Sequence, residues 1–209
     1  MIHSSRCLWL QCFILVLIAS MQIGCAARKR IGTFDYPTGA YKAADYEQFA
    51  GWLEGCDGKN ESRKRCHLGI DIKADEGAEV YPISSGEIVA ISSSGWNCRG
   101  SSGNVGVVVR HTLEDGTEFL ALYGHVRTNL RVNDTVFPGK AFATVGQWCN
   151  GNHLHFGMHP GLTMPATNWG SLPCRKCKDS HNGFVDPLEF IRNHRPSTDG
   201  STRLEKDHM

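Results

Sequence analysis

The feature that most constrains the fold is a series of short, apolar, β-type runs separated by glycine turns between residues 66 and 156. The runs are rich in β-branched residues, which favour strands. They are Leu68–Ile72, Val80–Pro82, Gly86–Ser92, Val105–Arg110, Glu118–Tyr123 and Ala141–Val145. Asp115-Gly116 and Pro138-Gly139 are typical of tight turns. The series predicts a mostly β fold, an antiparallel β-sandwich or barrel-like sheet.

The segments around this series divide the chain further. We expect a signal peptide over residues 1–27, an N-terminal extension over 28–66, a core over 67–160, a C-terminal extension of the domain over 161–195 and a flexible tail over 196–209. Apolar residues recur at helical spacing near residues 43–54, which predicts a short peripheral helix there.

The first 27 residues have the composition of an export signal. Arg6 precedes the apolar run Leu8–Ala19, which is shorter than the roughly 20 residues that span a bilayer. Ile23-Gly24-Cys25 resembles the end of a bacterial lipoprotein box, which implies a signal of residues 1–24 and membrane attachment through a lipidated Cys25. Cleavage after Ala27 and an uncleaved anchor are the alternatives. We therefore expect an exported protein of the periplasm or cell envelope, lipid-anchored or secreted.

Cysteine usage and charge agree with export. Six cysteines follow the signal region, an even number that suits disulfides in an oxidising compartment. Among the 15 arrangements that six cysteines allow, proximity and loop placement favour Cys56–Cys66, Cys98–Cys149 and Cys174–Cys177. A zinc knuckle is the alternative for the last pair. The formal net charge of +1 gives no reason to expect a nucleic-acid partner.

Two segments concentrate side chains that can bind a metal. In a strand over 67–72, His67 and Asp71 share one face, while Leu68, Ile70 and Ile72 share the other. Four strand steps separate the Cα atoms of His67 and Asp71 by roughly 13 Å, which is far for one ion. A bend or bulge at Gly69 would bring them together. A helix is the alternative reading, disfavoured by the glycine and the two isoleucines.

The second segment is Asn152-His153-Leu154-His155-Phe156-Gly157. His153 and His155 share a strand face and lie about 7 Å apart, so that one can bind metal and the other can transfer protons. His125 follows a further predicted strand. The five residues suit a three-ligand zinc site with an open position and two proton-transfer groups.

The stretch from about 67 to 157 resembles the lysostaphin-type (LytM-like) zinc endopeptidases, which hydrolyse peptidoglycan. The matching motifs occur in order: His67-Leu68-Gly69-Ile70-Asp71-Ile72, Ser85-Gly86-Glu87-Ile88-Val89, Gly103-Asn104, Tyr123-Gly124-His125-Val126, Val136-x-Pro138-Gly139-Lys140 and Gly151-Asn152-His153-Leu154-His155-Phe156-Gly157. The departures are Val126, the turn Gln147-Trp148-Cys149-Asn150 and the loop around Cys98.

The resemblance implies one Zn²⁺ held by His67, Asp71 and His155, with His125 and His153 as the unliganded catalytic pair. It also implies a zinc metalloendopeptidase whose metal-activated water cuts peptide stems of peptidoglycan. The general base is either His125 or His153, and the bond is either a D-alanyl cross-link or a glycine-rich bridge. A catalytically silent peptidoglycan-binding or hydrolase-activating module is the alternative function. His159 is a candidate substrate contact, and His111 is expected at a strand end.

Overall fold

The computed structural model describes residues 37–38, 46–47, 52–53, 65–166, 169–173 and 181–194. The chain divides into two compact units, Met1–Ile31 and Gly32–Met209, and all described residues belong to the second. The predicted signal segment with Cys25, the tail 196–209 and the cysteines Cys56, Cys174 and Cys177 lie outside the described residues. In the described part of the chain, no helix is both long and apolar enough to cross a membrane.

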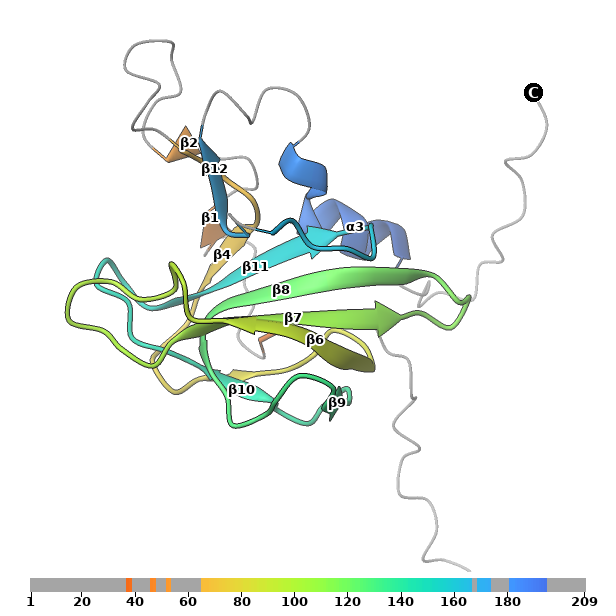
Figure 1. The fold of residues 1–209 in the computed structure, drawn as a ribbon, viewed down its shortest axis with the longest axis horizontal. Helices are drawn as coiled ribbons and strands as arrows, with labels where there is room; N and C mark the ends of the chain where they lie inside the picture. Colours follow the sequence, from red (N-terminus) through yellow and green to blue (C-terminus); the bar gives the residue numbers. More distant parts are fainter. Residues whose placement is uncertain are drawn as a thin grey trace, which may run out of the picture. The chain divides into compact units, whose positions relative to one another are not determined.

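The fold is a mostly β, antiparallel arrangement, as the sequence predicts, with one short α-helix among the described residues (Figure 1). The strands are β1 (Tyr46–Glu47), β2 (Trp52–Leu53), β3 (Arg65–His67), β4 (Ile70–Lys73), β5 (Glu79–Val80), β6 (Gly86–Ser92), β7 (Val105–Thr112), β8 (Glu118–Arg127), β9 (Thr135–Val136), β10 (Ala143–Val145), β11 (His153–His159) and β12 (Ser171–Pro173). A 3-10 turn, η1 (His181–Gly183), precedes helix α3 (Pro187–His194).

The strands form two sheets. The larger sheet has the order β1-β4-β11-β8-β7-β6-β9, and β10 pairs with both β5 and β8. The smaller sheet has the order β12-β3-β2. Figure 1 shows β11, β8, β7 and β6 side by side, although β11 follows β8 in the sequence by more than one strand. This crossover brings the second histidine segment between β4 and β8.

Strand β8 is buried on both faces, so the large sheet has a core on each side. Phe119, Ala121 and Tyr123 belong to one apolar cluster, and the alternate residues Leu120 and Leu122 belong to the other. The first cluster also takes up Ile191 of α3. The second cluster contains Trp96 and packs on the face that carries the histidines of β11.

Two expectations about the N-terminal part are wrong. The helix expected near 43–54 is absent at its described positions, because Tyr46–Glu47 pairs with β4 and Trp52–Leu53 pairs with β3. Backbone pairing at these sheet edges outweighs the helical spacing of the apolar residues. Leu68 also does not share a core with Ile70 and Ile72: it lies in the second cluster and they lie in the first.

Candidate metal centre

His67, Asp71 and His155 come together from three strands. The antiparallel register of β4 and β11 sets Asp71 opposite His155. The Oδ1 atom of Asp71 lies 3.0 Å from Nε2 of His67 and 3.1 Å from Nδ1 of His155. The two imidazole nitrogens lie 2.8 Å apart. Two nitrogens and one carboxylate oxygen therefore face a single point, and each donor atom lies within 4.8 Å of the others.

A bend at Leu68-Gly69, between two strands, allows His67 and Asp71 to approach each other. Strand β3 ends at His67 in the small sheet, and β4 starts at Ile70 in the large one. Gly69 is required there because β11 passes close by. A Cβ at position 69 would lie 2.5 Å from the carbonyl oxygen of Phe156 and 2.9 Å from Nε2 of His155. The turn removes the extended separation that a continuous strand would impose.

The donor set fits a divalent cation such as zinc. His67 and His155 are buried, and one further ring nitrogen of each, Nδ1 and Nε2 respectively, has no hydrogen-bond partner among the described residues. Burial alone would raise the pKa of Asp71, but the hydrogen bonds with His155 and His67 outweigh it and hold that pKa far below its ordinary value. Burial lowers the pKa of His155 to about 4. An ionised carboxylate beside neutral imidazoles is the form in which these groups bind zinc.

His125 and His153 lie beside this centre with their rings 4.7 Å apart. The Nδ1–H of His125 donates to the carbonyl of Trp96 at 3.2 Å, and the Nδ1–H of His153 donates to the carbonyl of Gly151 at 2.8 Å. Because a carbonyl only accepts, each bond fixes the proton on Nδ1 and leaves the Nε2 lone pair unprotonated in the neutral ring. Both rings can therefore accept a proton.

The environment keeps His125 neutral. Burial, together with smaller contributions from the nearby His153 and His155, lowers the pKa of His125 to about 3. Its backbone has a φ of 56°, in the left-handed region that costs energy for a residue other than glycine. A hydrogen bond from the Gly146 amide to the His125 carbonyl, at 2.7 Å, supports that conformation. Strain of this kind is common where a side chain must be aimed at a site.

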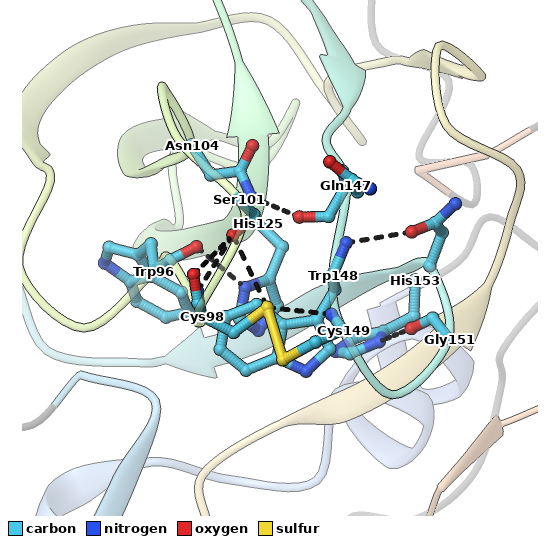
Figure 2. The surroundings of a disulfide bond; sticks show 11 residues. Trp96, Cys98, Ser101, Asn104, His125, Gln147, Trp148, Cys149, Gly151 and His153 are labelled. Atoms are coloured by element: carbon cyan, nitrogen blue, oxygen red, sulfur yellow. Dashed lines mark hydrogen bonds between the residues drawn. A yellow bond between two sulfur atoms is a disulfide. The ribbon is translucent and has the colours of Figure 1, made fainter.

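The sequence interpretation missed the two tryptophans that contact His125. Both tryptophans lie beside His125 (Figure 2): the Trp96 ring is 5.2 Å and the Trp148 ring is 4.0 Å from the His125 ring. The Trp96 ring also lies 5.4 Å from the His155 ring. Gly106 and Gly124 lie against the Trp96 indole, where any Cβ would overlap it. The departures at Gln147-Trp148-Cys149-Asn150 and at the Cys98 loop were the signal that could have found them.

The remaining histidines lie in different surroundings. His111 is fully buried in β7 near the end of the strand. His159 ends β11 and packs against Phe184, with its Nδ1 close to Gly161. A substrate contact by His159 stays a prediction.

The Cys98–Cys149 disulfide is confirmed, with Cα atoms 6.1 Å apart. Cys66 is also disulfide-bonded, and its predicted partner Cys56 lies outside the described residues, as does the Cys174–Cys177 pair.

Residues 65–165 match the family described as peptidase family M23. Residues 65–165, just under half of the chain, therefore form a region of peptidase family M23. The match begins at β3 and extends past β11, so this M23 region contains all five candidate site residues.

Several solved structures are similar to this chain at low identity. LytU is 20% identical and covers 76% of this chain and 91% of its own, with a TM-score of 0.48. The catalytic domain of lysostaphin from Staphylococcus simulans is 22% identical and covers 70% and 90%, with a TM-score of 0.43. A zinc containing peptidase from Vibrio cholerae is 19% identical and covers 62% and 36%, with a TM-score of 0.40. No curated protein sequence matches the chain.

Proposed function

We propose that this protein is an exported, zinc-dependent endopeptidase that hydrolyses peptide cross-links in bacterial peptidoglycan. The observation that carries the proposal is the convergence of His67, Asp71 and His155 on one point, with His125 and His153 left over beside it. The match of residues 65–165 to a peptidase family supports the reaction class.

His67, Asp71 and His155 would hold the ion, through Nε2, Oδ1 and Nδ1 respectively. When bound, zinc supplies Lewis-acid activation of water and of the scissile carbonyl. The carboxylate contributes the single negative charge among the three donors, so the site stays cationic overall and attracts a polarised carbonyl oxygen.

His125 and His153 are the proton-transfer groups of the proposed reaction. Each holds its Nδ1 proton on a backbone carbonyl, so each can accept a proton at Nε2 and return it to the leaving amine. A ring that has become protonated can donate a hydrogen bond to the developing oxyanion.

An extracytoplasmic location is part of the proposal. The Cys98–Cys149 disulfide and the bonded Cys66 suit an oxidising compartment, in agreement with the export signal expected over residues 1–27. Lipidation of Cys25 would attach the enzyme to the envelope, and a periplasmic enzyme would meet D-alanyl cross-links.

Digestion of purified peptidoglycan tests the proposal directly. The enzyme is incubated with peptidoglycan that carries D-alanyl cross-links and with peptidoglycan that carries glycine-rich bridges, each with and without a chelator. Mass spectrometry of the soluble fragments identifies the bond. We expect chelator-sensitive release of fragments from the first substrate. Binding to both substrates without any fragment release would instead favour the silent binding or activating module.

A further inference from the structure

Two loops next to His125 each carry a tryptophan and a cysteine. The first loop connects β6 to β7 and carries Trp96 and Cys98, and the second connects β10 to β11 and carries Trp148 and Cys149. Figure 2 shows both tryptophans, the disulfide and His125 gathered in one place. The cysteines are 51 positions apart in the sequence, so the bond joins two segments that are distant along the chain.

The first loop is rigid because its tryptophan is embedded in the core. Trp96 is 5% exposed and fills a space that has no side chain at Gly106 and Gly124. Asn97 and Asn104 exchange two hydrogen bonds, from Asn97 Nδ2 to the Asn104 carbonyl at 2.9 Å and from the Asn104 amide to Asn97 Oδ1 at 3.0 Å. These bonds close the loop onto the start of β7.

The second loop has fewer internal supports. Gln147 and Cys149 are exposed, and Trp148 is only half-buried. One bond inside the loop holds Trp148, whose amide donates to Oδ1 of Asn152 at 2.8 Å. Two bonds tie the loop to the first loop: Asn104 Nδ2 donates to the Gln147 carbonyl at 2.7 Å, and the Cys149 amide donates to Sγ of Cys98 at 2.8 Å. The disulfide is the covalent link between the two loops, so the position of Trp148 depends on the first loop as well as on Asn152.

Trp148 in turn packs on the His125 ring, which also contacts the rings of Trp96 at 5.2 Å and His153 at 4.7 Å. The His125 side chain makes one hydrogen bond, to Trp96, and its backbone is strained. The Trp148 indole covers the imidazole at 4.0 Å with the planes inclined at 44°. The same indole lies 6.2 Å from the His153 ring, so it borders both members of the catalytic pair.

We propose that the Cys98–Cys149 disulfide and Trp148 form one positioning unit, in which the bond holds the indole over His125 and thereby fixes the orientation of that imidazole for proton transfer. Neither the disulfide nor Trp148 touches the reacting atoms, and both act through His125. The unit makes no bond to His67 or Asp71, so its loss should leave metal binding intact. This inference rests on the proposed function for its kinetic consequence, but its structural consequence can be measured without turnover.

The kinetic experiment compares wild type with a Cys98→Ser/Cys149→Ser variant, Trp148→Ala, and the three changes combined, all zinc-loaded and assayed on peptidoglycan fragments well below their unfolding temperatures. We expect unchanged zinc content, little change in KM and a fall in kcat of about tenfold or more, since small misplacements of a catalytic group are costly. The combined variant should lose no more than Trp148→Ala alone, because both changes remove the same contact. Trp148→Phe should restore most of kcat.

The structural experiment records the imidazole ¹⁵N signals of His125. In wild type we expect a single tautomer with the proton on Nδ1. In the disulfide variant and in Trp148→Ala we expect averaged or broadened signals. Phe137→Ala, which removes an aromatic ring that is 53% exposed on the turn after β9, is the control and should change neither signals nor kcat.

Two results would overturn the positioning unit: wild-type His125 signals in the variants, or kcat losses from the disulfide and from Trp148 that multiply in the combined variant. If wild type itself releases no fragments, the proposed function fails, and the NMR comparison alone decides the inference.

Discussion

His111 and the histidines of the candidate metal centre are all buried, and they differ in what their ring nitrogens contact. His111 lies on the face of the large sheet that carries the first core cluster, and both of its ring nitrogens form hydrogen bonds. Its Nδ1–H donates to the Ser85 carbonyl at 3.1 Å, and its Nε2 accepts from the Tyr123 hydroxyl at 3.1 Å. The same hydroxyl accepts the Ile83 amide at 3.1 Å, which completes the chain of bonds. At the metal centre, one nitrogen of His67 and one of His155 have no hydrogen-bond partner in the described protein.

The comparison shows that burial and residue type do not separate His111 from His155, a candidate metal ligand. Burial lowers the pKa of both His111 and His155 to about 4. What differs is the neighbour. A neutral hydroxyl and a carbonyl satisfy His111, whereas a carboxylate and a second imidazole converge on His155. At His155, the lone pairs of several donor atoms face one point, and a metal cation bound at that point would stabilise this arrangement.

The largest expected effect is on zinc content at the metal centre. His155→Ala removes one of the three proposed ligands, so we expect almost no bound zinc by atomic emission and no measurable release of peptidoglycan fragments. His111→Gln is the matched control, since it replaces an equally buried histidine, and the folded control should keep one zinc per chain. Full zinc occupancy in His155→Ala would erase the distinction between the two groups.

The next effect distinguishes the proposed zinc ligands from the neighbouring His125 and His153, whose loss should lower activity but not zinc content. His153→Ala should keep its zinc and lose hydrolysis by about 10²–10⁴-fold, the usual contribution of a proton-transfer group. His125→Ala should behave similarly. Zinc content and kcat measured on the same preparations check the prediction, and a His153 variant that hydrolyses peptidoglycan as fast as wild type contradicts it.

A third effect appears in the pH dependence of stability. The pKa of His111 falls from 6.5 to about 4 on folding because of burial. The unfolded chain therefore binds the proton first as pH falls, and stability is lost between about pH 6.5 and pH 4. We expect this loss to amount to about 3 kcal/mol.

Urea unfolding at pH 7 and pH 4, with chelator present throughout, measures this loss. The difference between the two pH values should be about 3 kcal/mol smaller in His111→Gln than in wild type, since the other histidines titrate in both proteins. If the unfolding free energy depends equally on pH in the two proteins, folding does not lower the pKa of His111, and the prediction is wrong.

The smallest effect tests the partner of His111. Tyr123→Phe removes the hydroxyl that accepts from the Ile83 amide and donates to His111, so two buried groups lose a bond. We expect a loss of about 2 kcal/mol in unfolding free energy, with zinc content unchanged. Denaturant titration alongside zinc analysis checks this, and a loss of zinc would mean that the two histidine groups are coupled through β8.

The sequence by itself determined the class of fold and the alternation of side chains along the strands. In Ile70-Asp71-Ile72 and His153-Leu154-His155-Phe156, the apolar residues enter the first core cluster and the candidate ligands face the other way, as the two-residue period of a strand requires. Those choices are local, so the order of residues in a short segment is enough to fix them. The motif order also pointed to the family to which residues 65–165 belong.

Tertiary structure alone decided where these local faces meet. The turn at Leu68-Gly69 sends Leu68 into a different core from Ile70, and β1 forms where helical spacing had suggested a helix. The contacts of Trp96 and Trp148 with His125, and the paired nitrogens of His111, likewise join residues distant in the chain. The physical reason is that strand pairing and close packing of side chains depend on which surfaces the whole chain brings together. The periodicity of a short segment does not determine which surfaces those are.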